Sequence, residues 1–349
     1  MVVPRPPHRL RDLADQAGLS LATVDRVLHG RPGVSARAVR QVEQAVLDLD
    51  RQQAQLRLAA RTLMLDVVMQ APARFSQAVR EALESELAGV RPAAVRARFD
   101  LRERGEVSDL VDVLDRVGSR GRTSHGVLLK APDHPEVATA IDRLHARGIP
   151  VVTLVTDVRR CSRIAYVGLD NDAAGATAAY LLSSWLGTLP GDVLVTVSRS
   201  SFFGERERRD AFIARMTDRS PGRALVEVGE GDGLDETTAA AVREALRDER
   251  DISGVYSIGG GNRAIATELA RAGREPHVFI GHDLDRDNVA LLLGGTLSAV
   301  LHHDLHADMR RALRQVLRHH RLAPGAPTSV RANVQVVTPF NVPARWSPA

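Results

Sequence analysis

The sequence predicts a small all-α head followed by an α/β body of two doubly wound parallel-sheet lobes. Short helical patterns separated by glycine turns fill the first 50 residues. From Thr62 onward, near-continuous runs of valine, isoleucine and leucine alternate with helical stretches. This alternation is typical of parallel strands that are buried on both faces. It occurs in two successive sets, which predicts two lobes.

The head is expected to contain three helices joined by short turns. Gly18 supplies the positive φ that ends the first helix, and Ser20 is placed to cap the second helix, Leu21 to Leu28. The outer face of this second helix is expected to present Leu21, Ala22, Asp25 and Arg26. Ser35 caps the third helix, whose core-facing stripe is Val39, Val42, Val46 and Leu49.

A helix, a glycine turn, a second helix and a supporting helix form the layout of a helix-turn-helix, whose second helix enters the DNA major groove. Residues 1–61 contain ten arginines and six carboxylates, a surplus of four positive charges that equals the surplus of the whole chain. Positive charge concentrated on one module is what phosphate binding requires. The alternative of a plain three-helix cap on an enzyme leaves this charge unexplained.

The string LADQAGLSLATVDRVLHGRPGVSARAVRQV resembles the DNA-binding head of the LacI/GalR (lactose-repressor) family of bacterial regulators. By that resemblance Leu21, Ala22 and Arg26 approach base edges, while Thr23 and the region of Ser20 meet phosphate. Arg31 completes the expected DNA-binding set, together with Asp25, where the family commonly has serine. A carboxylate at this position accepts a hydrogen bond from a cytosine amino group but repels phosphate.

Residues 51–61 join the head, residues 1–50, to the body, residues 62–349. This polar stretch is either a short helix or a plain tether. In the resembled family it folds on DNA into a hinge helix, and a leucine pair from the dimer opens the minor groove. Gln53 and Ala60 replace the family's usual proline and leucine, which leaves Leu58 or Leu56 as the expected wedge.

The body is expected to alternate strands and helices in order. The first set has strands over 63–69, 94–100, 125–131, 149–157 and 166–170, with helices over 75–87, 107–117, 136–147 and 173–186. The second set has strands over 191–198, 223–230, 252–260 and 277–283, with helices over 205–216, 236–247 and 262–272, and a further strand is expected over 296–301.

This body resembles the type I periplasmic-binding-protein fold of the same family, through strings such as GIPVVTLVTD, YVGLDNDAAGATAAYLL and FIGHD. In that fold the chain crosses three times between lobes, and the crossings are expected near 158–162, 284–287 and 318–325. The N-lobe then holds about 62–158 and 287–318, and the C-lobe about 163–283 and 325–349. Ligands of open α/β sheets bind at the carboxyl ends of strands, which here face each other across a cleft.

The resemblance also places the effector-binding residues. Asp283 ends a strand at the cleft edge and corresponds to the family's sugar-binding aspartate; the alternative is a helix N-cap. Arg208 corresponds to an arginine that donates to ligand hydroxyls or carboxylates, with Arg206 its near rival. The remaining candidates are His303 after the strand TLSAVL, Asn262 at a helix start, and Phe75, Phe202 and Phe203 on expected cleft loops.

Other chemistry is weakly supported by the sequence. HHDLH, residues 302–306, places imidazoles at helical spacing but lacks a carboxylate pattern such as HExxH, so no metal is expected. No nucleophile–base pairing emerges, which argues against an enzyme, and no cofactor is expected. Asp170, in the VGLDN string, and Asp157 are expected to act in lobe geometry and signalling.

Composition and the absence of long apolar runs indicate the compartment expected for this protein. Hydrophobic residues make up 44% of the chain and charged residues 26%, which is ordinary for a globular protein. No apolar run approaches the roughly 20 residues of a membrane span, and the N-terminus lacks the apolar region of an export signal. The single cysteine, Cys161, cannot form an internal disulfide, which fits a cytoplasmic location.

The sequence therefore predicts a cytoplasmic, homodimeric transcriptional regulator, expected to be a repressor. Its partners are double-stranded operator DNA and a small effector, a sugar or polyol, bound between the lobes. The alternatives are a solute-binding protein that captures a sugar for transport and a sugar-modifying enzyme fused to a regulatory head.

Overall fold

The computed structural model describes residues 8–59, 61–248 and 250–346, and of residues 51–59 it describes the backbone alone. The chain divides into two compact units, which are treated separately below. One, the head, comprises Met1–Thr62 with Val90–Ala94, and the other, the body, comprises Leu63–Gly89 with Val95–Ala349. Within the described residues, no helix combines the length and apolarity that crossing a bilayer demands.

The head forms the three helices that the sequence predicts: α1 (Leu10–Ala17), α2 (Leu21–Leu28) and α3 (Ala36–Ala59). Gly18 ends α1 in the left-handed conformation, as predicted. The Ser20 hydroxyl accepts a hydrogen bond from the Thr23 amide and the Ser35 hydroxyl accepts one from the Ala38 amide, each at 3.2 Å, so both predicted serine caps are confirmed. Leu13, Val24 and Val42 are buried together where the helices meet. Because Val24 and Val27 of α2 are buried in this cluster, the opposite face of α2 is exposed to solvent.

The third helix differs from the prediction. It does not end near Leu49 but continues without a break to Ala59, so no separate connecting element exists between residues 50 and 59. The absence of glycine and proline between Ala36 and Ala59 explains this, because nothing in that stretch disfavours helix. The wedge expected from Leu56 or Leu58 concerns side chains outside the described residues.

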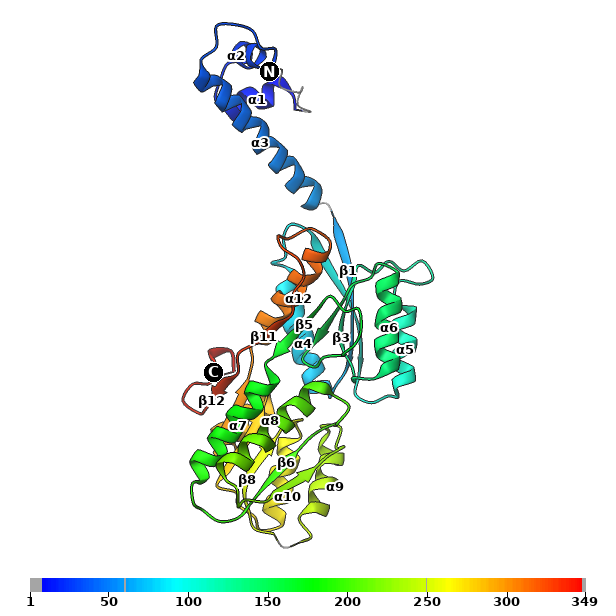
Figure 1. Cartoon of the computed structure of the whole chain (residues 1–349), viewed down its shortest axis with the longest axis vertical. Coiled ribbons are helices and arrows are strands. Elements are labelled where there is room, and N and C mark those ends of the chain that lie inside the picture. The colour runs from blue at the N-terminus through cyan, green and yellow to red at the C-terminus, as the bar shows by residue number, and fades with distance from the viewer. Residues whose placement is uncertain (1–7, 60, 249, 347–349) are drawn as a thin grey trace. The chain divides into compact units, whose positions relative to one another are not determined.

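The first sheet of the body has strand order β11-β5-β4-β3-β1-β2. Figure 1 shows α5 and α6 on one side of it and α4 and α12 on the other. Its strands are β1 (Thr62–Gln70), β2 (Ala94–Arg102), β3 (Gly126–Lys130), β4 (Val151–Leu154), β5 (Ala165–Leu169) and β11 (Val330–Ala332). Its helices are α4 (Ala73–Leu87), α5 (Val107–Arg116), α6 (Pro135–Ala146) and α12 (Leu305–His319).

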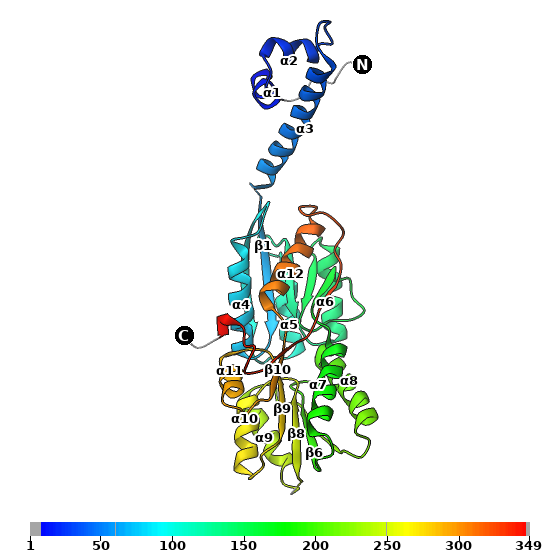
Figure 2. The same cartoon turned by 90° about the vertical axis from the view of Figure 1, so that its left-hand side faces the viewer.

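The second sheet has strand order β12-β10-β9-β8-β6-β7 and lies between α7 and α8 on one face and α9, α10 and α11 on the other (Figure 2). Its strands are β6 (Asp192–Thr196), β7 (Leu225–Val228), β8 (Ile252–Ser257), β9 (Val278–His282), β10 (Ala299–His302) and β12 (Gln335–Val337). Its helices are α7 (Asn171–Leu186), α8 (Phe203–Arg219), α9 (Asp235–Ala245), α10 (Asn262–Arg271) and α11 (Arg286–Leu293), and the short turn η1 (Ala344–Trp346) follows β12.

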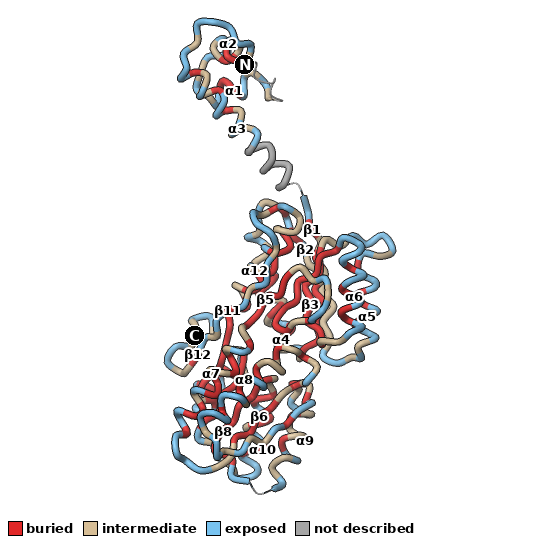
Figure 3. The backbone as a smooth tube through the Cα atoms, viewed as in Figure 1, coloured by how far each residue is buried: buried red, intermediate tan, exposed pale blue. Residues whose placement is uncertain are grey.

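The predicted two-lobed α/β fold is confirmed, with one antiparallel addition. The central strands β3, β5, β8 and β9 are buried throughout, as their uninterrupted apolar sequences predict (Figure 3). The edge strand β12 runs antiparallel to β10, pairing Val337 with Val300. The sequence did not predict β12, because a strand of three residues leaves too short an alternating pattern.

The predicted crossing points between the lobes were wrong. The first lies between β5 and α7 at Asp170, the second between β10 and α12 at residues 303–304, and the third between β11 and β12 at residues 333–334. Strand β5 and residues 320–332 therefore belong to the N-lobe, while residues 287–302 belong to the C-lobe. Each error has the same cause, since a terminal strand was assigned to the wrong sheet and sheet membership is a long-range property.

A glycine at the contact of α7 with α8 gives a testable consequence of this packing. A Cβ on Gly175 would lie 2.1 Å from the carbonyl oxygen of Arg208, so Gly175→Ala should destabilise the body by about 1–3 kcal/mol. Thermal unfolding of the full chain measures it, with Gly222→Ala as the matched control because a Cβ added there would meet nothing within 4 Å. Equal melting temperatures for the two variants would contradict this description of the α7–α8 contact.

Candidate functional site

The carboxyl ends of strands from both sheets converge on one pocket in the body. Gln70 ends β1 and Lys130 ends β3 in the N-lobe, while His282 ends β9 in the C-lobe, and all three line the pocket. The space they enclose, including its opening to solvent, is about 850 Å³. Ligands of open α/β sheets bind at this position, outside the carboxyl ends of the strands.

Asp283 lines this pocket directly after β9, with φ at +63° and a partly exposed carboxylate. The N-cap of α11 is Asp285, which accepts from the Asn288 amide at 2.7 Å, so the alternative that Asp283 caps that helix is wrong. No described hydrogen-bond donor occupies the Asp283 carboxylate. Its oxygens are therefore available to accept from hydroxyl groups in the pocket.

His303 does not reach the pocket, contrary to the prediction that it contacts ligand. It is buried behind Asp283, with Nε2 at 3.6 Å from the Asp283 carboxylate and Nδ1 at 2.5 Å from Asp308. Burial is the largest single influence on the pKa of His303 and lowers it. The hydrogen bond to Asp308 and the charges of Asp308 and Asp283 together outweigh burial, so the pKa is raised above the ordinary histidine value. His303 thus lies behind Asp283 and is held in place by Asp308.

Arg208 lies on the pocket wall, as predicted, and is almost fully buried. Its Nε donates to Asn171 Oδ1 at 2.7 Å, and one terminal nitrogen donates to the Ile258 carbonyl at 3.3 Å. Lys130 faces the same pocket, donating from Nζ to the Gln70 carbonyl at 3.0 Å. The ammonium also lies 3.8 Å from the ring centroid of Phe202.

Asn262 and Phe75 also line the pocket. Asn262 is buried, and its Nδ2 donates to Asn288 while its Oδ1 has no partner among the described residues. Because Gly261 is the N-cap of α10, Asn262 is the first helical residue and its side chain is not used as a cap. A buried, unpaired amide oxygen on a pocket wall is costly unless a ligand donates to it.

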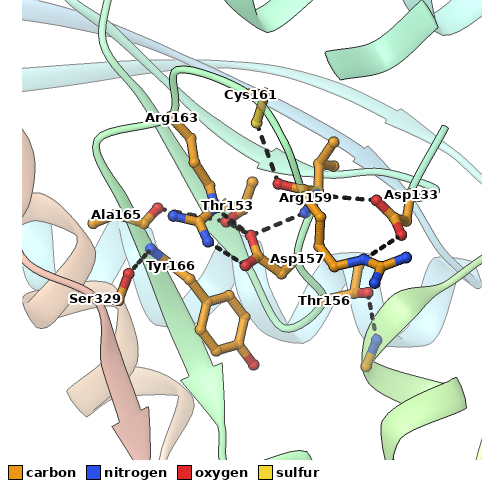
Figure 4. Close-up of polar contacts among 12 residues, drawn as sticks. Asp133, Thr153, Thr156, Asp157, Arg159, Cys161, Arg163, Ala165, Tyr166 and Ser329 are labelled. Carbon is orange, nitrogen blue, oxygen red and sulfur yellow. Dashed lines mark hydrogen bonds and ion pairs between the residues drawn. The ribbon is translucent and has the colours of Figure 1, made fainter. Parts of the chain in front are cut away.

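Arg206 and Phe203 do not line the pocket, contrary to their assignment as effector-binding residues. Helix α8 turns them to its other side, where the Phe203 ring lies between the guanidinium groups of Arg206 and Arg159. Arg206 donates to Asp133 at 3.0 Å. Arg159 donates to the same carboxylate at 2.9 Å, and Figure 4 shows this contact between Arg159 and Asp133. These contacts join the C-lobe helix α8 to N-lobe loops.

Asp157 and Asp170 occupy structural positions near the lobe boundary. Asp157 accepts from Thr153 and the Val158 amide and is paired with Arg163, which fixes the loop between β4 and β5 (Figure 4). Asp170 caps α7, accepting from the Ala173 amide at 3.1 Å, at the first crossing between lobes. Both residues therefore lie where a change in the arrangement of the two lobes would alter their contacts.

The histidines of HHDLH are each engaged separately. His302 accepts from the Leu284 amide, His303 contacts Asp308, and His306 contacts Ser85. Among residues 8–59, 61–248 and 250–346, no three His, Cys, Asp or Glu side chains are grouped as metal ligands.

The outer face of α2 carries the residues expected to read DNA. Leu21, Ala22 and Arg26 are exposed, and Leu21 keeps 48% of its surface accessible although it is apolar. The Ser20 hydroxyl lies 2.8 Å from the hydroxyl of Thr23, which places both at the start of the helix. A helix N-terminus with hydroxyls is suited to phosphate contact.

Asp25 is not an isolated carboxylate on this face. Arg31 Nη1 lies 3.0 Å from one of its oxygens and His29 Nδ1 lies 3.0 Å from the other. Pairing with Arg31 offsets the repulsion of phosphate that the sequence alone suggested. Asp25 therefore positions Arg31 beside the recognition helix.

Family models match almost the whole chain. The model of the bacterial regulatory proteins of the lacI family matches residues 9–50, and the periplasmic binding protein domain matches residues 50–320. The chain belongs to the LacI family, with a periplasmic-binding-protein body. The predicted resemblance is thereby confirmed. No match was found among curated proteins.

Solved structures share the fold of this LacI-family body at low sequence identity. A glucose-galactose binding protein, GanP, from Geobacillus stearothermophilus is 17% identical, with a TM-score of 0.71, covering 81% of this chain and 99% of its own. A solute binding protein from Burkholderia graminis in complex with D-arabinose is 20% identical, with a TM-score of 0.73 and coverages of 81% and 97%. A putative LacI transcriptional regulator from Bacteroides fragilis is 16% identical, with a TM-score of 0.70 and coverages of 80% and 98%.

Sequence reasoning missed several pocket residues of this LacI-family protein. Lys130 is the single lysine of the chain, and its place at the end of a buried strand is a signal from which the sequence could have predicted it. The other missed residues include Arg74, Ser198, Arg199, Glu205, Asp232 and His282. Ser198, Arg199 and Asp232 lie on connecting loops, which carry no periodic pattern, whereas the other three lie in the first turn of a helix or at the end of a strand.

Proposed function

We propose that this chain is a transcriptional repressor that binds operator DNA as a homodimer and is controlled by a sugar or polyol bound in the body pocket. Occupying an operator is sufficient for repression, whereas activation requires a further contact with the transcription machinery. Such a protein acts on the chromosome, in the cytoplasm.

The observation that carries the proposal is the presence, on one chain, of an exposed recognition helix and a pocket with unpaired polar groups. Helix α2 presents Leu21 and Arg26 to solvent, and the head holds the chain's surplus of positive charge. In the pocket, Asp283 and Asn262 offer acceptors for hydroxyl groups. The similarity in fold to a glucose-galactose binding protein and to a solute binding protein in complex with D-arabinose supports a carbohydrate effector.

The lobe contacts suggest how a ligand would act. Both lobes contribute polar groups to the pocket. A ligand that contacts groups of both lobes therefore stabilises one arrangement of the lobes relative to each other. The effector can shift the equilibrium only through its different affinity for the two arrangements. Asp170 at the first crossing and the Arg206–Asp133 contact would respond to such a shift.

The test begins with selection of bound duplexes from a random pool, followed by fluorescence anisotropy of the selected duplex at increasing salt. We expect a pseudo-palindromic site and an affinity that falls steeply with salt. Titration of a sugar library into the complex should then release the DNA. A solute-binding protein without a regulatory role would instead bind sugar and show no selected duplex, which would overturn the proposal.

A further inference from the structure

Two cations in the pocket are buried without a carboxylate partner. Lys130 is 7% exposed and Arg208 is 4% exposed, and within the described part of the chain both donate to neutral oxygens and neither forms an ion pair with a carboxylate. The Lys130 ammonium has three hydrogens and donates one to the Gln70 carbonyl. Arg208 donates only to the neutral oxygens of Asn171 and Ile258. Both groups retain donors directed at no anion.

The other arginines that line the pocket are treated differently. Each is neutralised by a carboxylate of the protein: Arg74 by Asp285, Arg199 by Asp232, and Arg263 by Asp287. Lys130 and Arg208 therefore differ from these three arginines, whose charges are paired with carboxylates of the protein.

Glu205 is the carboxylate with the strongest effect on the pKa of Lys130, and its oxygens already accept hydrogen bonds from the protein. Its oxygens accept from the Ser198 amide at 2.8 Å and from the Ser198 hydroxyl at 2.6 Å. Burial lowers the pKa of Lys130 to about 8, and the attraction of Glu205 does not offset this effect. The charge of Arg208 lowers the same pKa further, so the two cations repel each other. Burying like charges together is unfavourable unless an anion joins them.

We propose that the effector carries a carboxylate that binds between Lys130 and Arg208 while its hydroxyl groups bind Asp283, so that the effector is a sugar acid. This inference rests on the proposed function of the pocket. It narrows the ligand class from sugars and polyols in general to aldonates and uronates.

The charge balance favours a carboxylate over a phosphate. Two carboxylates of the protein, Glu205 and Asp283, already act on Lys130 in this pocket. A phosphate dianion would bring twice the negative charge of a carboxylate to these groups, so the carboxylate meets less repulsion. The glycine turn before α10 is not a phosphate cradle either. A Cβ on Gly259 would lie 2.3 Å from the Ser198 amide nitrogen, and one on Gly260 would lie 2.5 Å from Arg74, so protein fills the space beside both glycines.

Isothermal titration calorimetry of the full chain without DNA tests the inference with matched pairs of ligands. The pairs are D-galacturonate with D-galactose, D-glucuronate with D-glucose, and D-gluconate with D-glucitol. We expect at least one acid to bind tenfold or more tightly than its neutral partner at pH 7. Lys130→Met should remove this preference, and Arg208→Lys should reduce it. Arg215→Gln, an exposed arginine on the same helix as Arg208, should leave it intact.

The pH dependence supplies a second measurement that does not depend on comparing variants' stability. The charged groups that act on Lys130 are Glu205 and Arg208 of α8, Arg199 before that helix, and Asp283 after β9. Because the free ammonium loses its proton as pH rises through about 8, affinity for the acid should fall between pH 7 and pH 9.5. Affinity for the neutral partner, and the residual affinity of Lys130→Met for the acid, should stay level.

The outcomes separate this inference from the proposed function. Equal or tighter binding of the neutral sugars, or no binding of any acid in the set, overturns the carboxylate assignment. Binding of neutral sugars that release operator DNA would leave the proposed regulator intact. Tighter binding of a sugar phosphate than of the corresponding acid would likewise overturn the assignment.

Discussion

Asp283→Asn is expected to weaken effector binding by about 100-fold. The carboxylate offers two acceptor oxygens to ligand hydroxyls, and the amide replaces one of them by a donor. Loss of one charge-assisted hydrogen bond and weakening of the other amounts to about 3 kcal/mol, or roughly two factors of ten. Asparagine is the right replacement because it tolerates the left-handed backbone at φ +63°. Calorimetry with whichever sugar or sugar acid binds the wild-type chain measures the effect.

Asp218→Asn is the matched control, since Asp218 is an exposed carboxylate near the end of α8. It should bind the effector as the wild type does. The Asp283→Asn protein should still bind operator DNA but should need about 100-fold more effector to release it. An unchanged effector affinity would show that Asp283 does not contact the ligand.

Arg26→Ala should lower the affinity for the selected operator by about 1–3 kcal/mol, equivalent to roughly 10- to 100-fold. Arg26 is exposed on the outer face of α2, and a guanidinium there can donate two hydrogen bonds to a guanine edge. Loss of a base contact weakens specific binding while nonspecific affinity changes little. Anisotropy with the operator and with a scrambled duplex of equal length measures both quantities.

Arg31→Ala provides the contrast for Arg26→Ala. If Arg31 contacts phosphate, its loss should weaken binding to both duplexes alike and reduce the slope of log affinity against log salt by about one. Arg215→Gln in the body should change neither quantity. Equal losses on both duplexes for Arg26→Ala would contradict its assignment to a base edge.

The parts of the fold that the sequence predicts correctly are those governed by local pattern. The Gly18 turn and the Ser20 cap follow from backbone conformation and hydrogen bonding within a few residues, and both are present. The alternation of buried strands with helices predicts two parallel sheets for the same reason. Asp283 could be placed at the pocket because parallel strands end at one edge of their sheet.

The incorrect predictions concern properties that depend on distant segments. Strand β11 joins the first sheet by pairing with β5, 163 residues earlier in the sequence, whereas β12, which begins three residues later, joins the second sheet by pairing with β10, so this crossing could not be read from neighbours in sequence. Arg206 and Arg208 lie two positions apart on α8, about 200° around the helix, and only the packing of α8 decides which one faces the pocket. Phe202, the extended N-cap residue of α8, lines the pocket, whereas Phe203, the first residue of the helix, does not.

The central claim is that the head and the pocket are energetically coupled in one chain. Linkage requires that if the effector lowers operator affinity by a given factor, saturating operator lowers effector affinity by the same factor. Calorimetric titration of the effector into the full chain, with and without saturating operator duplex, measures this directly. We expect equal factors in the two directions; an effector affinity that is unchanged by operator would contradict the coupling.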